Sequence, residues 1–274
     1  MKILICTGGS KFAERAVKLS ARLMDADDDI TIFHVKEEGV TPEMFEECKG
    51  ILKEHEIPAK TKLCENKSGV AKEILNEAEK NYDLIIMGSL GMSSHGHGSF
   101  HRFLLGMNAF RVVENAKTSV LIIRGTHPPD KVLAGISGSA HDYKVVDFAC
   151  SLFDGHISKI KFLHVLPEIS EHFKVFMPPQ VRRSMRELLE DEEFQRPEHE
   201  YLNKCAKIAG KYDIPEIKTR LREGDAAAQI LNEAEEGGYD LIVIGAQKSE
   251  NFPLGDAAHR VVNYSRNSFL VVRR

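Results

Sequence analysis

The chain contains one segment twice. EILNEAEKNYDLIIMG, residues 73–88, returns as QILNEAEEGGYDLIVIG, residues 229–245. Four further pairs recur in the same order: Gly9-Ser10 with Gly138-Ser139, His34-Val35 with His164-Val165, Ile57-Pro58 with Ile214-Pro215, and Arg111-Val112-Val113 with Arg260-Val261-Val262. This duplication predicts two copies of one domain, and 274 residues suit two domains of about 100–150 residues each.

The spacing between matched positions locates the domains and an insertion. We place the first domain at residues 1–125, a linker at 126–130, where Pro128-Pro129 interrupts the pattern, and the second domain at 131–274. The separation is 129 at the first loop (139 − 10), 130 at the second strand (164 − 34) and 157 later (215 − 58), so the second half carries 27 extra residues (157 − 130). They fall in 166–201, and this segment is either a lid over a ligand cleft or a surface that packs on the other half.

Composition excludes several classes of protein. The 37 basic and 41 acidic residues give a formal charge of −4, and no long tract of one sign would attract nucleic acid or a membrane surface. The five cysteines are odd in number and show no C-x-x-C spacing, as expected of reduced, buried thiols. The chain opens on an apolar strand without a leader, and it lacks the ~20 apolar residues of a spanning helix. We expect a cytoplasmic protein.

Each half alternates short apolar runs with helical patterns. Several runs are apolar throughout, as in parallel strands that are buried on both faces. The predicted strands are 2–6, 30–35, 61–64, 83–87 and 119–123 in the first half, and 131–136, 158–165, 217–221, 240–244 and 268–272 in the second. The predicted fold class is therefore α/β, with two tandem, doubly wound, Rossmann-like domains that each have a five-stranded parallel sheet.

Ligands of such sheets collect beyond the carboxyl ends of the strands, where the strand order reverses. The loops there are rich in glycine: Thr7-Gly8-Gly9-Ser10 follows the first strand and Gly88-Ser89-Leu90-Gly91 the fourth. Free backbone amides next to a helix N-terminus suit an anion such as phosphate. Glycine at a strand-to-helix turn can also serve sterics alone.

The sequence resembles the universal stress protein family in its tandem two-domain form. The resemblance covers the whole chain and rests on the Gly-Ser after the first strand, the His-Val of the second, the Ile-Leu-x-x-Ala helix before Tyr-Asp-Leu-Ile, the glycine loop, and the closing Ser119–Arg124. It implies a domain like the adenine nucleotide alpha hydrolases. In many members this domain binds ATP or AMP through G-x2-G-x9-G-[ST] and an aspartate of the first loop.

Neither half keeps that motif intact. In the first half Gly88 and Gly91 match, but Gly106 follows Gly88 by 18 residues (106 − 88) where the motif has 13, and Gly8 stands at the aspartate position. The resemblance still implies a candidate site for one ATP or AMP in this half. Its residues are Thr7, Gly8, Gly9, Val35, Met87, Gly88, Gly91, Gly106, Met107 and Asn108.

The second half departs further from the motif. Gly255 follows Gly245 by only 10 residues (255 − 245), Lys248 replaces the second glycine, and Ser137 replaces the loop aspartate. Asp256 follows Gly255, and we expect it to cap the next helix and to repel phosphate.

The sequence offers little catalytic machinery. It has no G-x-S-x-G, no helical H-E-x-x-H and no closely spaced carboxylate pair, so we assign no catalytic residue. Slow ATP hydrolysis is the most we expect. His34 and His164 end apolar strands, which indicates a structural role, and the loop histidines His95, His97 and His101 lack a fixed fourth ligand, so no metal site is assigned.

Two functional hypotheses remain. The first is a stress-response protein that binds one adenine nucleotide in its first half. The alternative is a degenerate scaffold without a nucleotide, acting through unknown protein partners or a small apolar ligand. In the family, single domains pair through their last strands, which implies an intramolecular pseudo-dimer through 120–123 and 269–272 and allows a homodimer of the whole chain.

Overall fold

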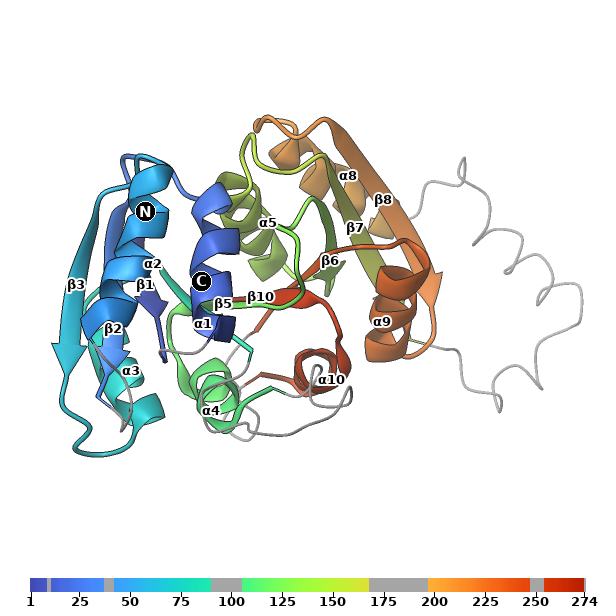
Figure 1. Ribbon diagram of the computed structural model, residues 1–274. Coiled ribbons are helices and arrows are strands. Elements are labelled where there is room, and N and C mark those ends of the chain that lie inside the picture. Colours follow the sequence, from blue (N-terminus) through green and yellow to red (C-terminus); the bar gives the residue numbers. More distant parts are fainter. Residues whose placement is uncertain (9–10, 37–41, 90–104, 168–196, 247–253, 274) are drawn as a thin grey trace, which may run out of the picture.

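The two halves share one continuous sheet. The computed structural model describes residues 1–8, 11–36, 42–89, 105–167, 197–246 and 254–273, and its ten described strands follow the order β3-β2-β1-β4-β5-β10-β9-β6-β7-β8 (Figure 1). The elements of the first half are β1 (Lys2–Cys6), α1 (Lys11–Ser20), η1 (Ala21–Leu23), β2 (Asp29–Val35), α2 (Pro42–Glu54), β3 (Ala59–Cys64), α3 (Val70–Ala78), β4 (Leu84–Gly88), α4 (Met107–Asn115) and β5 (Ser119–Ile123). Those of the second half are β6 (Lys131–Ile136), α5 (His141–Leu152), β7 (Lys159–Leu166), α8 (Pro197–Ala209), β8 (Glu216–Glu223), α9 (Ala226–Glu236), β9 (Leu241–Gly245), α10 (Asp256–Tyr264) and β10 (Ser268–Val272).

Strand direction changes once, at the junction of the halves. Strands within each half pair in parallel, whereas β5 and β10 pair antiparallel, with Leu121 opposite Leu270. The predicted fold class is confirmed, and each strand lies within two residues of its predicted range. The predicted pairing of the last strands is also confirmed. Most of the predicted insertion, residues 168–196, lies outside the described part of the chain.

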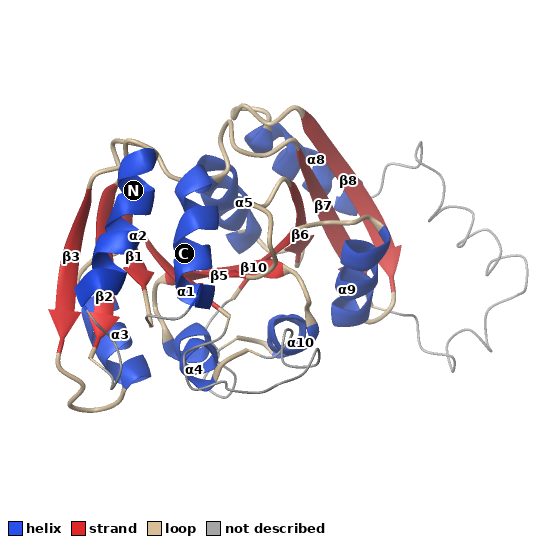
Figure 2. Ribbon diagram, viewed as in Figure 1, coloured by secondary structure: helices blue, strands red, loops and turns tan. Residues whose placement is uncertain are grey.

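Helices cover both faces of the sheet (Figure 2). Residues of α1, α2, α5 and α8 belong to one buried cluster, and residues of α3, α4, α9 and α10 belong to another. Each cluster contains strand residues from both halves, so the hydrophobic core runs without a break across the junction. No helix in the described ranges has the length and apolar character needed to cross a bilayer.

Two arginines at equivalent positions tie the halves together. Arg124 follows β5, its backbone N–H donates to Ser268 Oγ (2.9 Å), and its guanidinium donates to the carbonyl oxygen of Ser265. Arg273 follows β10, its N–H donates to Ser119 Oγ (3.1 Å), and its guanidinium donates to the carbonyl oxygen of Val113 (2.9 Å), at the end of α4. Arg273 follows Arg124 by 149 residues (273 − 124), and Ser268 follows Ser119 by the same number (268 − 119). The two contacts are therefore equivalent, and the junction has approximate two-fold symmetry.

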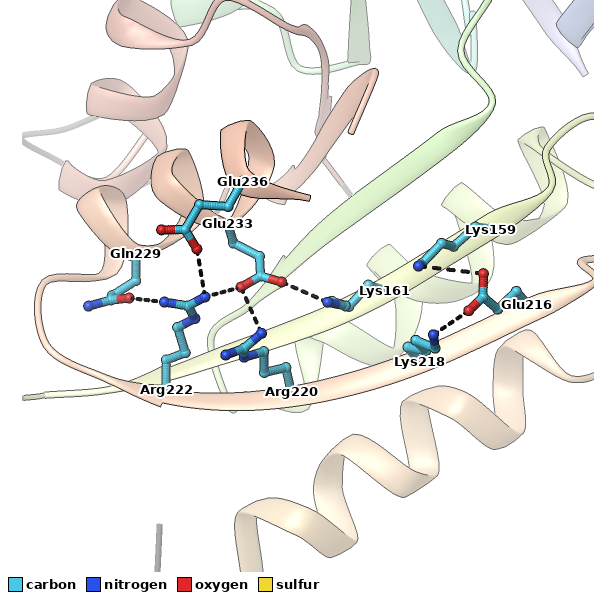
Figure 3. Close-up of polar contacts among 9 residues, drawn as sticks. All are labelled: Lys159, Lys161, Glu216, Lys218, Arg220, Arg222, Gln229, Glu233 and Glu236. Carbon is cyan, nitrogen blue, oxygen red and sulfur yellow. Dashed lines mark hydrogen bonds and ion pairs between the residues drawn. The ribbon is translucent and has the colours of Figure 1, made fainter. Parts of the chain in front are cut away.

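A buried carboxylate anchors α9 to the edge of the sheet (Figure 3). Glu233 is 3% exposed and forms ion pairs with Lys161 of β7 (2.7 Å) and with Arg220 (3.5 Å) and Arg222 of β8. These cations form its counter-charge, which a buried carboxylate requires. The first half repeats the arrangement on α3, where Glu77 pairs with Lys62 (2.8 Å) and Lys80 (2.7 Å).

The cysteines are free, and four of the five are buried, as the sequence indicates. Burial raises the pKa of Cys48 to about 11 and those of Cys150 and Cys205 to about 12. These thiols are therefore protonated near neutral pH, and a protonated thiol is a poor nucleophile and metal ligand.

Candidate functional site

The first half has its switch point at the carboxyl end of β1. This strand lies between β2 and β4, with Cys6 opposite Phe33 on one side and Met87 on the other. The chain leaves β1 for α1 on one face of the sheet and leaves β4 for α4 on the other. This is where open α/β sheets bind ligands.

The loop after β1 leaves open space at its described end. Thr7 is held by its N–H, which donates to the carbonyl oxygen of Phe33 (3.0 Å), and by its own carbonyl oxygen, which lies 2.6 Å from His34 Nδ1. Because a carbonyl only accepts, His34 donates from Nδ1, which supports the predicted structural role, although its buried Nε2 has no hydrogen-bond partner among the described residues. Among the described residues, no atom beyond the chain neighbours lies within 4 Å of where a Cβ on Gly8 would be.

The start of α4 lies next to the end of β4, at the carboxyl end of the sheet of the first half. Gly106 N donates to the carbonyl oxygen of Ser89 (2.7 Å), so the residue after β4 and the N-cap of α4 lie next to each other. Gly106 is the N-cap in extended conformation (φ −61°, ψ 148°), and no described side chain caps the helix. The first turn carries no acidic residue, and Met107 is 66% exposed. The helix N-terminus therefore keeps amide groups that an anion can use.

The structure brings most of the predicted site residues to this edge. Thr7 and Gly8 end β1, Val35 ends β2, and Met87 and Gly88 end β4. Gly106, Met107 and Asn108 join them through the bond from Gly106 to Ser89. The side chains of Val35 and Met87 are buried among the core residues packed under α3 and α4. Gly9, Gly91 and the histidines at 95, 97 and 101 lie outside the described residues.

The second half fills the equivalent loop with a carboxylate of its own. Asp142, on the first turn of α5, is 2% exposed. Its Oδ2 accepts from the backbone amides of Ser137 (3.0 Å), Gly138 (2.9 Å) and Ser139 (2.9 Å). It also accepts from Ser137 Oγ (2.9 Å) and from the hydroxyl of Tyr201 on α8 (2.8 Å), whose single proton it shares with the carbonyl oxygen of Ser139. Burial, and then the hydrogen bond to Asp142, raise the pKa of Tyr201, which keeps its hydroxyl a neutral donor.

A close approach of the backbone to His164 constrains this loop. Gly138 has φ +86°, and a Cβ there would lie 2.9 Å from His164 Cε1. Nδ1 of His164 donates to the carbonyl oxygen of Ile136 (2.7 Å), which fixes the ring and confirms its predicted structural role.

Alanine at these two loops should therefore have different effects. We expect Gly138→Ala to lower the free energy of unfolding by about 1–3 kcal/mol, because it combines a strained φ with a steric clash. Gly8→Ala, in the open loop, should change it by less than about 0.5 kcal/mol. Urea unfolding followed by circular dichroism measures both, and equal losses would contradict the difference between the loops.

Asp256 does not cap its helix as the sequence analysis expected. Gly255 is the N-cap of α10 with φ +74°, and Asp256 is the first helical residue, with its side chain 85% exposed. Its carboxylate lies 3.7 Å from Arg260 Nη1, and Arg260 pairs more closely with Asp225 (2.6 Å). Glycine takes the cap because the chain enters the helix at a positive φ, which glycine adopts without strain.

Comparison with known proteins identifies the family. The model of the universal stress protein family matches residues 44–124 and again residues 129–273, which together make up most of the chain. The chain belongs to the universal stress protein family. Universal stress protein YxiE of Bacillus subtilis (strain 168) is 26% identical over 160 residues, which cover 53% of this chain and 99% of YxiE.

Two solved structures share the tandem fold of this universal stress protein. A protein from Pseudomonas aeruginosa UCBPP-PA14, described as a universal stress protein, superposes with a TM-score of 0.69 at 14% identity, covering 99% of this chain and 92% of that one. A universal stress protein from Archaeoglobus fulgidus DSM 4304 gives 0.66 at 19% identity, covering 100% and 98%. At these identities the likeness shows the fold alone.

Asp142 was not singled out from the sequence, although its carboxylate accepts several hydrogen bonds at the carboxyl end of β6 in this universal stress protein. A signal was present in the repeat. Asp142 follows Ala13 by 129 residues (142 − 13), the separation already seen between Ser10 and Ser139. A carboxylate in place of alanine in the first turn after a glycine loop can accept hydrogen bonds from that loop's amides, as Asp142 does.

Proposed function

We propose that this universal stress protein is a cytoplasmic stress-response protein that binds one ATP or AMP per chain, in its first half, and is not an enzyme. The observation that carries the proposal is the contrast between the two switch points. No described atom beyond the chain neighbours lies within 4 Å of a Cβ placed on Gly8, and the amides at the start of α4 have no described side-chain cap, whereas Asp142 fills the loop of the second half. The five free cysteines fit a reducing compartment.

The residues at this edge divide by chemistry. Gly88, Gly106 and Asn108 would meet phosphate oxygens through backbone amides and the Asn108 amide group. Thr7 and Gly8 would lie along the ribose. The ends of β2 and β4, at Val35 and Met87, would give the base an apolar edge. Hydrolysis would need an acidic group to hold magnesium near the phosphates, and the family's loop aspartate is replaced here by Gly8. This supports binding without turnover.

A charge placed at the start of α4 tests the proposal. Asn108→Asp puts a carboxylate where phosphate is proposed to bind, and should weaken AMP or ATP binding by about tenfold or more. Asn115→Asp makes the same substitution at the far end of the same helix, about 10 Å away, and should change affinity by less than about twofold. Isothermal titration with and without magnesium measures affinity, and native mass spectrometry measures stoichiometry.

The outcomes separate the two hypotheses. One nucleotide per wild-type chain, weakened only by Asn108→Asp, supports the proposal. Two nucleotides per chain, or equal losses in both variants, would contradict the assignment to the first half. No binding at millimolar nucleotide would leave the alternative, a scaffold that acts through protein partners or a small apolar ligand.

A further inference from the structure

The loop after β6 has the arrangement of hydrogen-bond donors that is typical of an anion-binding site. Three consecutive amides, from Ser137 to Ser139, converge on one carboxylate oxygen at 2.9–3.0 Å, and the hydroxyls of Ser137 and Tyr201 complete the set. Convergent amides of this kind commonly hold a phosphate or carboxylate ligand. Here the anion is the side chain of Asp142, which belongs to the same chain.

The first half lacks both parts of this arrangement. Ala13 stands at the position of Asp142, so α1 has no carboxylate there. The ring that packs on His34 is Phe45 of α2 (5.0 Å between centroids), whereas the ring near His164 is Tyr201 of α8 (6.4 Å). The second half therefore has both the acid and the hydroxyl that donates to it, whereas the described positions equivalent to them in the first half are Ala13 and Phe45. The acid and its hydroxyl donor thus occur together in the second half, which a helix cap alone would not require.

We infer that Asp142 is a tethered substitute for a ligand anion. It occupies the amides of Ser137–Ser139 permanently, and Tyr201 fastens it to α8. The loop amides of the second half are thus bound to an anion without any free ligand. Phosphates and carboxylates from solution are excluded from these amides. This inference does not depend on nucleotide binding by the first half.

Removal of the carboxylate should create a site for a small free anion. Asp142→Ala should lower the melting temperature by about 5 °C or more in sodium chloride, because several donors lose their partner. Replacing chloride by formate at equal ionic strength should restore about half of that loss at ~0.1–0.5 M, since formate then binds the folded state. Inorganic phosphate serves as a second probe. Wild type should show no such difference between salts.

A matched acid in the same half provides the control. Asp225 caps α9 by accepting from Ala228 N (2.8 Å), but its side chain is half exposed and no described loop surrounds it with several amides. Asp225→Ala should therefore show no formate-specific recovery. The inference is overturned if Asp142→Ala loses no stability, if formate does not recover it, or if Asp225→Ala recovers equally.

A milder pair of variants decides the matter if Asp142→Ala is unfolded in both salts. Tyr201→Phe removes one donor to Asp142 and should lower the melting temperature by about 2–4 °C. Tyr143→Phe removes a hydroxyl that makes none of the bonds to Asp142, from a ring only 5.0 Å from that of Tyr201. It should leave the melting temperature unchanged, and equal effects of the two variants would overturn the role of Tyr201 and the inference with it.

Discussion

Replacing Phe269 by alanine is expected to lower the free energy of unfolding by about 3–5 kcal/mol, the range for a fully buried aromatic side chain. Phe269 is fully buried, lies opposite Ile122 across the junction of the halves, and has the Arg124 guanidinium 5.1 Å from its ring centroid. Its loss leaves a cavity where β5 meets β10 and removes the ring on which that guanidinium rests. Urea unfolding followed by circular dichroism gives the free energy.

The control is Tyr264→Ala, which removes an aromatic ring five residues earlier (269 − 264) from a side chain that is 71% exposed. It should change stability by less than about 0.5 kcal/mol. Because both buried clusters cross the junction, the wild type should unfold in one transition, and Phe269→Ala should broaden or divide it. Two separate transitions in the wild type would contradict the view that the halves share one core.

Glu233→Gln is expected to lower the free energy of unfolding by about 2–3 kcal/mol at pH 7. Breaking a buried ion pair costs about 3–5 kcal/mol, and the value here is smaller because Arg220 and Arg222 reach water. Glutamine keeps the shape of the side chain but removes the counter-charge of Lys161 and Arg220, while Arg222 keeps its more exposed pair with Glu236 (3.2 Å). Glu216→Gln is the matched control: Glu216 lies on β8, its half-exposed carboxylate pairs with Lys159 and Lys218, and its substitution should have a much smaller effect.

The pH dependence of the Glu233 contribution follows from its pKa. Burial alone would raise the pKa, but the hydrogen bonds and charges of Lys161, Arg222 and Arg220 outweigh it and lower the pKa. A carboxylate with a lowered folded-state pKa stabilises the protein fully above its unfolded pKa of about 4.3. The stabilisation is lost as pH falls through the folded pKa. The difference between wild type and Glu233→Gln should therefore be constant from pH 6 to 8 and shrink below about pH 4. A difference that persists unchanged in acid would contradict an ionic origin.

The sequence predicted the inner strands better than the edge strands. β1, β5 and β10 are apolar on both faces, and their predicted ranges agree with the structure. β3 and β8 lie at the two edges of the sheet, and each begins one or two residues before the apolar pattern indicates. Arg220 and Arg222 on β8 point toward α9, where Glu233 pairs with both, so local hydropathy underestimates the strand (Figure 3).

The site was harder to predict than the fold. Glycine loops after β1 and β4 follow from sequence, because their positions after apolar strands are local information. The contact between Tyr201 and Asp142 joins residues 59 positions apart (201 − 142), across a segment that the first half does not have. Asp256 was misjudged because a carboxylate beside a helix start can be the cap or the first helical residue, and only the backbone angle of Gly255 decides.

The antiparallel pairing of β5 with β10 places the loops of the two halves at opposite ends of the shared sheet. The carboxyl ends of the first half's strands all lie at one end of the shared sheet, and those of the second half's strands lie at the opposite end. A protein that contacts one end of the sheet therefore meets the loops at the carboxyl ends of one half's strands, beside the amino ends of the other half's strands. Because approximate two-fold symmetry relates the halves, the two ends of the sheet have the same architecture and differ only where the sequences of the halves differ. A single partner at one end contacts the loops of one half alone, so the two sets of loops cannot be contacted together from one side.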